Sequence, residues 1–271
     1  MKVAPRTAPR DIPLKNSSLR ICILAFVFCQ IGSVSAFAET RGSAAPDQFI
    51  ETVANIKLSV APISCMRQSG AAVSFGGNVG TAFFVSAQGA FVTPSHVIEL
   101  FLPGGTFADC IAAISLTRGG WHQGPAVWHG ELFDIHQCAL DHHLDVARCS
   151  TRSDLETEDG GVYRPRAVTF DTTIRPDGSE AAFTGFPLTT TIPITTRGYI
   201  AGYGSQGATI DELYIDKGDW PGSSGSPAFD GSGDVIGMVI KRTTGEAWGF
   251  AVCRPAYLIQ KFLSEHPLAA P

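Results

Sequence analysis

The chain has 271 residues, of which 44% are hydrophobic and only 17% are charged. This composition supplies a sizeable core and argues against bulk disorder. Glycine (29 residues) and proline (17 residues) are frequent, which is typical of many short strands joined by turns.

Residues 1–38 are predicted to be a signal peptide. A basic lead from Lys2 to Arg20 precedes an apolar run from Ile21 to Phe28, and Ala36 and Ala38 supply the small residues before a cut after Ala38. The apolar run is shorter than the roughly 20 residues of a membrane span, although an uncleaved anchor is the alternative. We therefore expect a periplasmic or secreted protein with no membrane contact after signal removal.

The predicted mature chain is acidic. Removal of the signal peptide leaves 15 basic and 24 acidic residues, a net charge of −9. Such a surface repels nucleic acid, which we exclude as a partner. Five cysteines remain, and an oxidising compartment allows disulfides, but the odd number leaves at least one thiol free or paired between chains. Their pairing stays open; they are Cys65, Cys110, Cys138, Cys149 and Cys253.

The first half begins with an N-terminal segment at 39–55. A short helix is predicted over Phe49–Ile56, and alternation predicts a strand over Ile56–Val60. A clearer signal follows, because residues 80–85 and 90–93 are strand-like and enclose turn residues, which predicts a hairpin.

The second half again alternates short strand-like runs with turn residues. It follows a polar, acidic run at 153–161 that is predicted to link two halves. Strand candidates follow at 181–185, 198–202, 212–215 and 234–240. Helical spacing returns only at 256–263, where four apolar residues share one face. The pattern favours an all-β body, built as two small barrels, with a C-terminal helix.

Ser224 is the strongest candidate for a catalytic group. It lies between Gly222 and Gly225, with Pro221 and Pro227 as flanking residues. Glycine permits a tight backbone, and the N–H groups of Gly222 and Ser224 would then form an oxyanion hole. The alternative is an ordinary glycine and serine turn.

A nucleophilic serine needs a base and a carboxylate that orients the base. His96 follows a hydrophobic strand, where a site residue can be held rigidly; its alternative is a core histidine. Asp145 has apolar neighbours and must be paired or exposed; its alternative is a turn aspartate. The order His96, Asp145, Ser224 is more informative than any of the three alone.

With these residues the chain resembles the chymotrypsin/trypsin-like serine protease family, most closely the bacterial HtrA/Deg and glutamyl-endopeptidase-like branch. The matching stretches are Gly80–Val85 with Gly89, Thr93–Val97, Asp145–Ala147, Thr184–Pro187, Pro221–Pro227, Asp234–Gly237 and Gly249–Val252. The resemblance implies two six-stranded antiparallel β-barrels, at 56–160 with His96 and Asp145, and at 161–271 with Ser224 and the C-terminal helix. It further implies a secreted serine endopeptidase that cleaves proteins or peptides through an acyl-enzyme and needs no cofactor.

Two departures from the family carry predictions. Ser223 stands where digestive enzymes have the aspartate that pairs with a newly cut N-terminus, so we expect no such activation step. The chain ends 20 residues after Ala251, which leaves no room for the PDZ domain usual in the HtrA branch.

The resemblance places a primary specificity pocket around Asp219, Trp220, Ile240, Lys241 and Arg242. Three preferences stay open. An inward Asp219 would favour a basic side chain, Trp220 filling the pocket would favour small aliphatic ones, and Lys241 or Arg242 would favour acidic ones.

Three other interpretations compete. A catalytically inactive protease fold used as a binding module would normally lack a triad residue. An esterase of the α/β-hydrolase type needs Gly-x-Ser-x-Gly and a serine that precedes its partners. A zinc site could use the ligand types His136, Cys138, His142, His143 and Cys149, but their spacing matches no standard pattern, so we expect no metal.

Overall fold

The computed structural model describes residues 48–69, 72–116, 131–151, 155, 161–242 and 249–267. The predicted signal peptide and nearly all of the predicted linker at 153–161 lie outside these residues. None of the helices in the described ranges combines the length and the hydropathy that a transmembrane helix needs.

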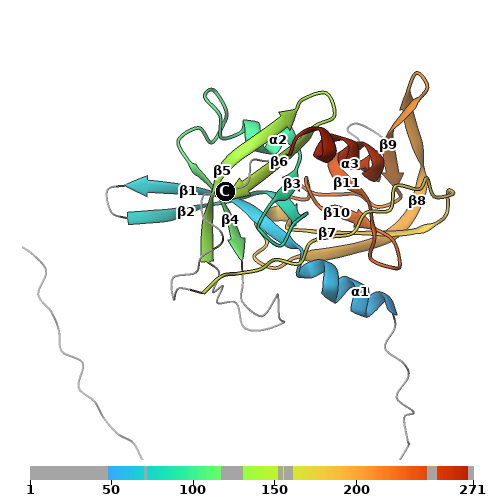
Figure 1. Ribbon diagram of the computed structural model, residues 1–271, viewed down its shortest axis with the longest axis horizontal. Helices are drawn as coiled ribbons and strands as arrows, with labels where there is room; N and C mark the ends of the chain where they lie inside the picture. The colour runs from blue at the N-terminus through green and yellow to red at the C-terminus, as the bar shows by residue number, and fades with distance from the viewer. Residues whose placement is uncertain are drawn as a thin grey trace, which may run out of the picture. The chain divides into compact units, whose positions relative to one another are not determined.

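Six antiparallel strands close the first barrel in the order β1-β2-β3-β6-β5-β4 (Figure 1). They are β1 (Val60–Ser69), β2 (Ala72–Phe84), β3 (Phe91–Thr93), β4 (Ile111–Leu116), β5 (Glu131–Asp141) and β6 (Val146–Thr151). The predicted hairpin is present, with Phe83 opposite Val92 in the register of β2 and β3.

The second barrel closes in the order β10-β11-β12-β9-β8-β7, again with antiparallel pairs. Its strands are β7 (Glu180–Gly185), β8 (Ile194–Gln206), β9 (Thr209–Ile215), β10 (Pro227–Phe229), β11 (Val235–Arg242) and β12 (Ala251–Pro255). A one-turn 3-10 helix, η1 (Pro187–Thr189), lies between β7 and β8. The prediction of an all-β fold with two six-stranded barrels is confirmed.

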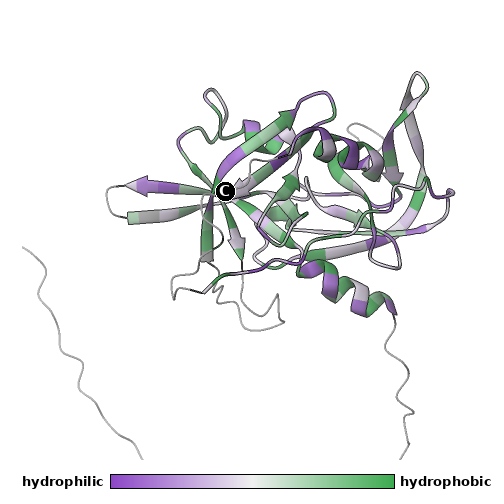
Figure 2. Cartoon of the chain, in the orientation of Figure 1, coloured by the Kyte–Doolittle hydropathy of each residue, from purple (hydrophilic) through white to green (hydrophobic). Residues whose placement is uncertain are grey.

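Within the described ranges, three α-helices accompany the barrels: α1 (Gln48–Lys57), α2 (Ser95–Glu99) and α3 (Ala256–Glu265). The predicted C-terminal helix is confirmed as α3, in which Ala256, Leu258, Ile259 and Phe262 are buried. Its ribbon carries both hydrophobic and hydrophilic residues (Figure 2). The strand predicted over Ile56–Val60 is wrong except at Val60, because α1 extends to Lys57 and a turn follows at 58–59. Ile56 is buried in α1 one turn after Thr52, so helical packing overrides the local alternation.

The largest core cluster draws on both barrels. Phe83 of β2, Phe229 of β10 and Phe262 of α3 are almost fully buried within it. Burial of this kind is worth about 1.5–3 kcal/mol for each large side chain. The two barrels therefore share a core that holds them together.

Four of the five remaining cysteines form disulfides, both in the first barrel. Cys65 of β1 pairs with Cys110 before β4, and Cys138 of β5 pairs with Cys149 of β6. Cys253 of β12 is buried with a free thiol. Burial, helped by the negative charge of Asp219, raises the pKa of the Cys253 thiol, so it stays protonated and inert.

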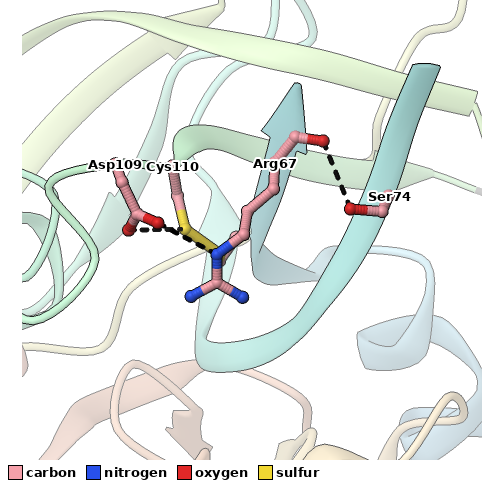
Figure 3. The surroundings of a disulfide bond; sticks show 5 residues. Arg67, Ser74, Asp109 and Cys110 are labelled. Atoms are coloured by element: carbon pink, nitrogen blue, oxygen red, sulfur yellow. Dashed lines mark hydrogen bonds and ion pairs between the residues drawn. A yellow bond between two sulfur atoms is a disulfide. The ribbon is translucent and has the colours of Figure 1, made fainter. Parts of the chain in front are cut away.

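Polar contacts surround the Cys65–Cys110 disulfide on the β1–β2 hairpin (Figure 3). Arg67 Nε donates to Asp109 Oδ2 at 3.0 Å, and the Ser74 hydroxyl donates to the carbonyl of Arg67 at 3.3 Å. These bonds link β1 both to its partner strand β2 and to the loop that precedes β4.

Candidate active site

His96 occupies the first turn of α2, directly after β3. Pro94 precedes the helix with φ −64° and ψ 147°, an extended conformation in which its ring restricts the chain. Val97 and Ile98 are buried and fix the helix against the first barrel, while the His96 side chain remains 43% exposed. The backbone of His96 is therefore held rigidly, whereas its side chain is accessible to a substrate.

Asp145 lies in the turn between β5 and β6 and receives three hydrogen bonds. Its φ of +54° is in the left-handed region, which aspartate tolerates better than most residues. Oδ2 lies 2.8 Å from His96 Nδ1, and Oδ1 accepts from the His96 N–H and the Ser95 hydroxyl, both at 3.0 Å. With Nδ1 engaged as a donor, Nε2 of neutral His96 is left as the acceptor.

These contacts determine the charge of Asp145. Partial burial acts to raise the pKa of this carboxyl, but hydrogen bonds from His96 and Ser95 together with the charge of His96 outweigh it and lower the pKa. Asp145 is thus held as a carboxylate, the form that can orient an imidazole.

Ser224 belongs to a loop whose backbone is fixed from the first barrel. Gly222 and Gly225 have φ of +96° and +95°, a conformation that suits glycine. The Thr81 N–H donates to the Ser224 carbonyl, and the Thr81 hydroxyl donates to the Gly222 carbonyl, both at 2.8 Å. One buried threonine of β2 thus holds two carbonyls on either side of Ser223.

The two peptide planes that carry the expected oxyanion donors are also fixed. The Leu188 N–H donates to the Pro221 carbonyl at 2.7 Å, and the Ser226 N–H donates to the Ser223 carbonyl at 2.9 Å. Because a peptide is planar and trans, these bonds fix the N–H of the following residue, Gly222 and Ser224 respectively. Neither of these N–H groups donates a hydrogen bond to another described residue.

Gly80 connects the histidine helix with the serine loop. A Cβ atom at this position would lie 2.7 Å from Val97 Cγ1 and 3.4 Å from the Ser224 carbonyl oxygen. Both segments therefore pack directly against the Gly80 backbone, where no side chain separates them from β2. Within the described part of the chain, Ser224 Oγ makes no hydrogen bond to His96 or any other group. Catalytic hydrogen bonds often tighten only when substrate binds.

The structure describes the side chains of three of the five predicted pocket residues, Asp219, Trp220 and Ile240, and the pocket itself stays a prediction. Asp219 is buried and close enough to Cys253 to affect its thiol, and Ile240 is buried in β11. Trp220 is 56% exposed and lines a surface depression beside Ser223, rather than filling an enclosed pocket. The side chains of Lys241 and Arg242 lie outside the described part of the structure.

Sequence reasoning missed three residues that support this arrangement. Ser95 contacts the Asp145 carboxylate, Thr81 anchors the serine loop, and Leu188 fixes the Pro221 peptide. The position of Ser95 beside His96 offered a signal. Nothing local distinguished Thr81 or Leu188, whose contacts span more than 30 residues.

The zinc interpretation loses its sulfur ligands, because Cys138 and Cys149 form a disulfide. His142 Nδ1 lies 2.6 Å from Glu99 Oε1 at the surface. Across the described ranges no three His, Cys, Asp or Glu side chains gather as a metal site would require.

Comparison with known proteins agrees with this geometry. Residues 80–238, a range that contains His96, Asp145 and Ser224, match the family model described as a trypsin-like peptidase domain. The chain belongs to the trypsin-like peptidase family. The match concerns trypsin-like peptidase domains in general, so the HtrA/Deg branch remains a prediction.

This trypsin-like peptidase domain also has a curated relative. It is 30% identical over 168 residues to the uncharacterized protein y4bJ of Sinorhizobium fredii (strain NBRC 101917 / NGR234). The alignment covers 61% of the chain but only 22% of the relative. The chain thus spans less than a quarter of that protein's length.

Proposed function

We propose that this chain is a serine endopeptidase that hydrolyses peptide bonds in protein or peptide substrates. The observation that carries the proposal is the 2.8 Å contact of His96 Nδ1 with a depressed-pKa Asp145. It occurs in a trypsin-like peptidase domain that also contains Ser224 on an anchored loop. No cofactor is required by this chemistry.

In the proposed mechanism, Ser224 Oγ bonds to the scissile carbonyl carbon while its proton passes to His96 Nε2. Asp145 holds the imidazole and stabilises its charged form, and the oxyanion accepts hydrogen bonds from the N–H groups of Gly222 and Ser224. His96 then gives its proton to the leaving amine as the C–N bond breaks. Water, activated by the same imidazole, hydrolyses the acyl-enzyme and restores Ser224.

We place the enzyme in the periplasm or outside the cell, after cleavage following Ala38. Two disulfides support this location, because such bonds persist in oxidising compartments. We further propose that no N-terminal cut inside the folded region is needed. Buried Ser223 is uncharged, and its hydroxyl already accepts the Trp220 N–H at 3.3 Å.

The test of catalysis is labelling with a fluorophosphonate probe, which reacts with activated serines. The wild type should label, whereas Ser224→Ala and His96→Ala should not. Equal labelling of all three proteins would refute the mechanism. N-terminal sequencing of the labelled protein tests activation, because label confined to chains cut within the barrels would contradict the proposal.

The second candidate function is an inactive protease fold that binds peptides. One observation favours it: Ser224 Oγ makes no hydrogen bond to a described residue. The same experiment decides between the two, because an inactive wild type would leave the probe unreacted while still binding peptides.

A further inference from the structure

The N-terminal helix α1 connects the two barrels. Only Leu58 and Ser59 separate it from β1 of the first barrel, yet the helix lies along the second barrel beside β7 (Figure 1). Ile56 is a buried member of the core cluster that draws on both barrels, and Phe49 and Val53 pack against that cluster. The helix is therefore joined to one half of the molecule by the chain and to the other half by its side chains.

The first turns of α1 contact the hairpin that follows the serine loop. The ring of Phe49 stacks on the ring of Phe229 in β10, with 6.4 Å between the centroids and an interplanar angle of 17°. The Thr52 hydroxyl donates to the carbonyl of Gly231, in the turn between β10 and β11, at 3.1 Å. Stacked aromatic pairs contribute beyond the area that they bury. The helix therefore holds both β10 and the turn that leads from it to β11.

The β10–β11 hairpin in turn holds the serine loop. β10 begins at Pro227, three residues after Ser224. The Gly225 N–H donates to the Val239 carbonyl of β11 at 2.7 Å, and the Val239 N–H donates to the Ser226 carbonyl at 2.9 Å. A displacement of this hairpin would therefore move the backbone on both sides of Ser224.

The other end of α1 is fixed to β2, the strand that contacts the serine loop from the first barrel. The Ser59 N–H donates to the Ile56 carbonyl at 2.8 Å, which closes a turn at the end of the helix. The carbonyl of buried Ser59 accepts the Phe84 N–H of β2 at 2.9 Å. Phe84 lies three residues after Thr81, which holds two carbonyls of the serine loop. The helix thus connects the two elements between which that loop is fixed.

We propose that α1 positions Ser224 relative to the first barrel and that Phe49 is a positioning residue for the proposed reaction. The inference rests on the proposed function and adds a regulatory consequence to it. Uncharged Ser223 cannot form an ion pair with a newly cut N-terminus, whereas α1 reaches the serine hairpin in the uncut chain. Loss of α1 should therefore lower activity, the opposite of activation by an N-terminal cut.

The experiment compares the wild type with Phe49→Ala, Phe49→Leu and Ile50→Ala. Phe49 is partly buried, so the fold should tolerate its truncation, and Ile50 is the matched control because it lies on the same helix and is 64% exposed. Fluorophosphonate labelling is followed at several probe concentrations. Saturation then separates the maximal rate, kinact, from KI, the probe concentration that gives half of that rate.

The kinact of Phe49→Ala should fall about 10-fold with KI unchanged, at a temperature at which circular dichroism shows the protein folded. The reason is that a misplacement of about 1 Å by a distant substitution can cost up to about 100-fold in rate. Phe49→Leu keeps part of the apolar contact and should have an intermediate kinact, and Ile50→Ala should match the wild type. A folded Phe49→Ala protein with wild-type kinact would overturn the inference, and so would an equal fall in Ile50→Ala.

Amide hydrogen exchange separates this inference from the proposed function, because it requires no catalysis. In peptides that cover residues 221–229, Phe49→Ala should raise the exchange rate about 10-fold and Ile50→Ala should leave it unchanged, since the bonds made by the Gly225 and Ser226 N–H groups lose their support. Unchanged exchange in Phe49→Ala overturns the inference. Absent fluorophosphonate labelling of the wild type together with faster exchange overturns the catalytic mechanism and leaves α1 as the element that orders the serine loop.

Discussion

At the scale of single residues, the Asp145 carboxylate owes its position to its neighbours in space rather than in sequence. Its left-handed backbone turns the carboxyl group toward α2, where Ser95 and His96 provide all three donors. Ser95 is therefore a positioning residue for the proposed triad.

Ser95→Ala should lower the free energy of unfolding by about 1.5–3 kcal/mol at neutral pH, the usual worth of a hydrogen bond to a charged group. The loss should shrink at acidic pH. A carboxyl whose folded pKa is depressed, as that of Asp145 is, contributes stability that is present above its unfolded pKa and lost as pH falls through the folded value. Urea unfolding at pH 7 and pH 3 measures both quantities, and an equal loss at the two pH values would contradict the role given to Ser95.

Gly225 is a second position at which a single added carbon atom should disturb the serine loop. A Cβ there would lie 1.8 Å from the Thr81 carbonyl oxygen, at a φ of +95° that L side chains rarely adopt. Gly225→Ala should cost more than about 2 kcal/mol of stability and abolish fluorophosphonate labelling, because strain and clash act together on the serine loop. Gly231→Ala, where a Cβ meets nothing within 4 Å, is the control, and similar melting temperatures for both variants would show the prediction to be wrong.

At the scale of elements, β12 of the second barrel supports the β5–β6 turn of the first. Arg254 is buried on β12, its Nε donates to the Leu144 carbonyl at 2.6 Å, and its Nη1 donates to the Asp211 carbonyl. Leu144 directly precedes Asp145, so one arginine holds the backbone on which the position of the Asp145 carboxylate depends.

Arg254→Met keeps the aliphatic stem but removes these bonds. A hydrogen bond that involves a charged group is worth about 1.5–3 kcal/mol, and the variant loses two such bonds. If Arg254 positions Asp145, kcat should fall more than KM changes at temperatures where the variant is folded. Arg197→Met, at an exposed arginine that pairs with Glu180, is the control. A variant with reduced stability but wild-type kcat would limit Arg254 to a structural role.

Elements with strong local signals were predictable. The hairpin of β2 and β3 and the apolar face of α3 were found because turn chemistry and periodicity are local. The strands between 103 and 159 were not individually predicted, because charged and polar residues interrupt the apolar pattern, as in β5 (Glu131–Asp141). The short helix α2 that carries His96 was not predicted, since five residues give too little periodicity to detect.

For the site, the order of His96, Asp145 and Ser224 identified the candidates without a structure. The hydrogen bonds that position them were beyond sequence reasoning, because Thr81 and Leu188 reach the serine loop only once the chain has folded. The specificity pocket stayed open for the same reason.

At the scale of the whole molecule, the cross-links are distributed unequally. Both disulfides lie in the barrel that holds His96 and Asp145, and the second barrel has only the buried thiol of Cys253.

Cys65→Ser/Cys110→Ser should destabilise the protein by about 4 kcal/mol and Cys138→Ser/Cys149→Ser by about 3 kcal/mol, because the first pair closes the longer loop. Cys253 should resist iodoacetamide until the protein unfolds, since its thiol is buried and protonated. Urea titrations of the variants and timed alkylation of the wild type measure these effects. Rapid alkylation of native protein at Cys253, or unchanged urea midpoints, would contradict them.

The two Thr81 hydrogen bonds also determine at which stage of folding the proposed site forms. The Gly222 and Ser224 carbonyls are held by a threonine of the other barrel, so the serine loop takes its final geometry only after the two barrels dock. A chain in which only the second barrel has folded keeps the Leu188 and Ser226 hydrogen bonds but lacks the two Thr81 bonds, and it has no folded partner that supplies His96 and Asp145. Under the proposed function, proteolytic activity is then acquired only after both barrels have folded, so half-folded copies cannot cut one another.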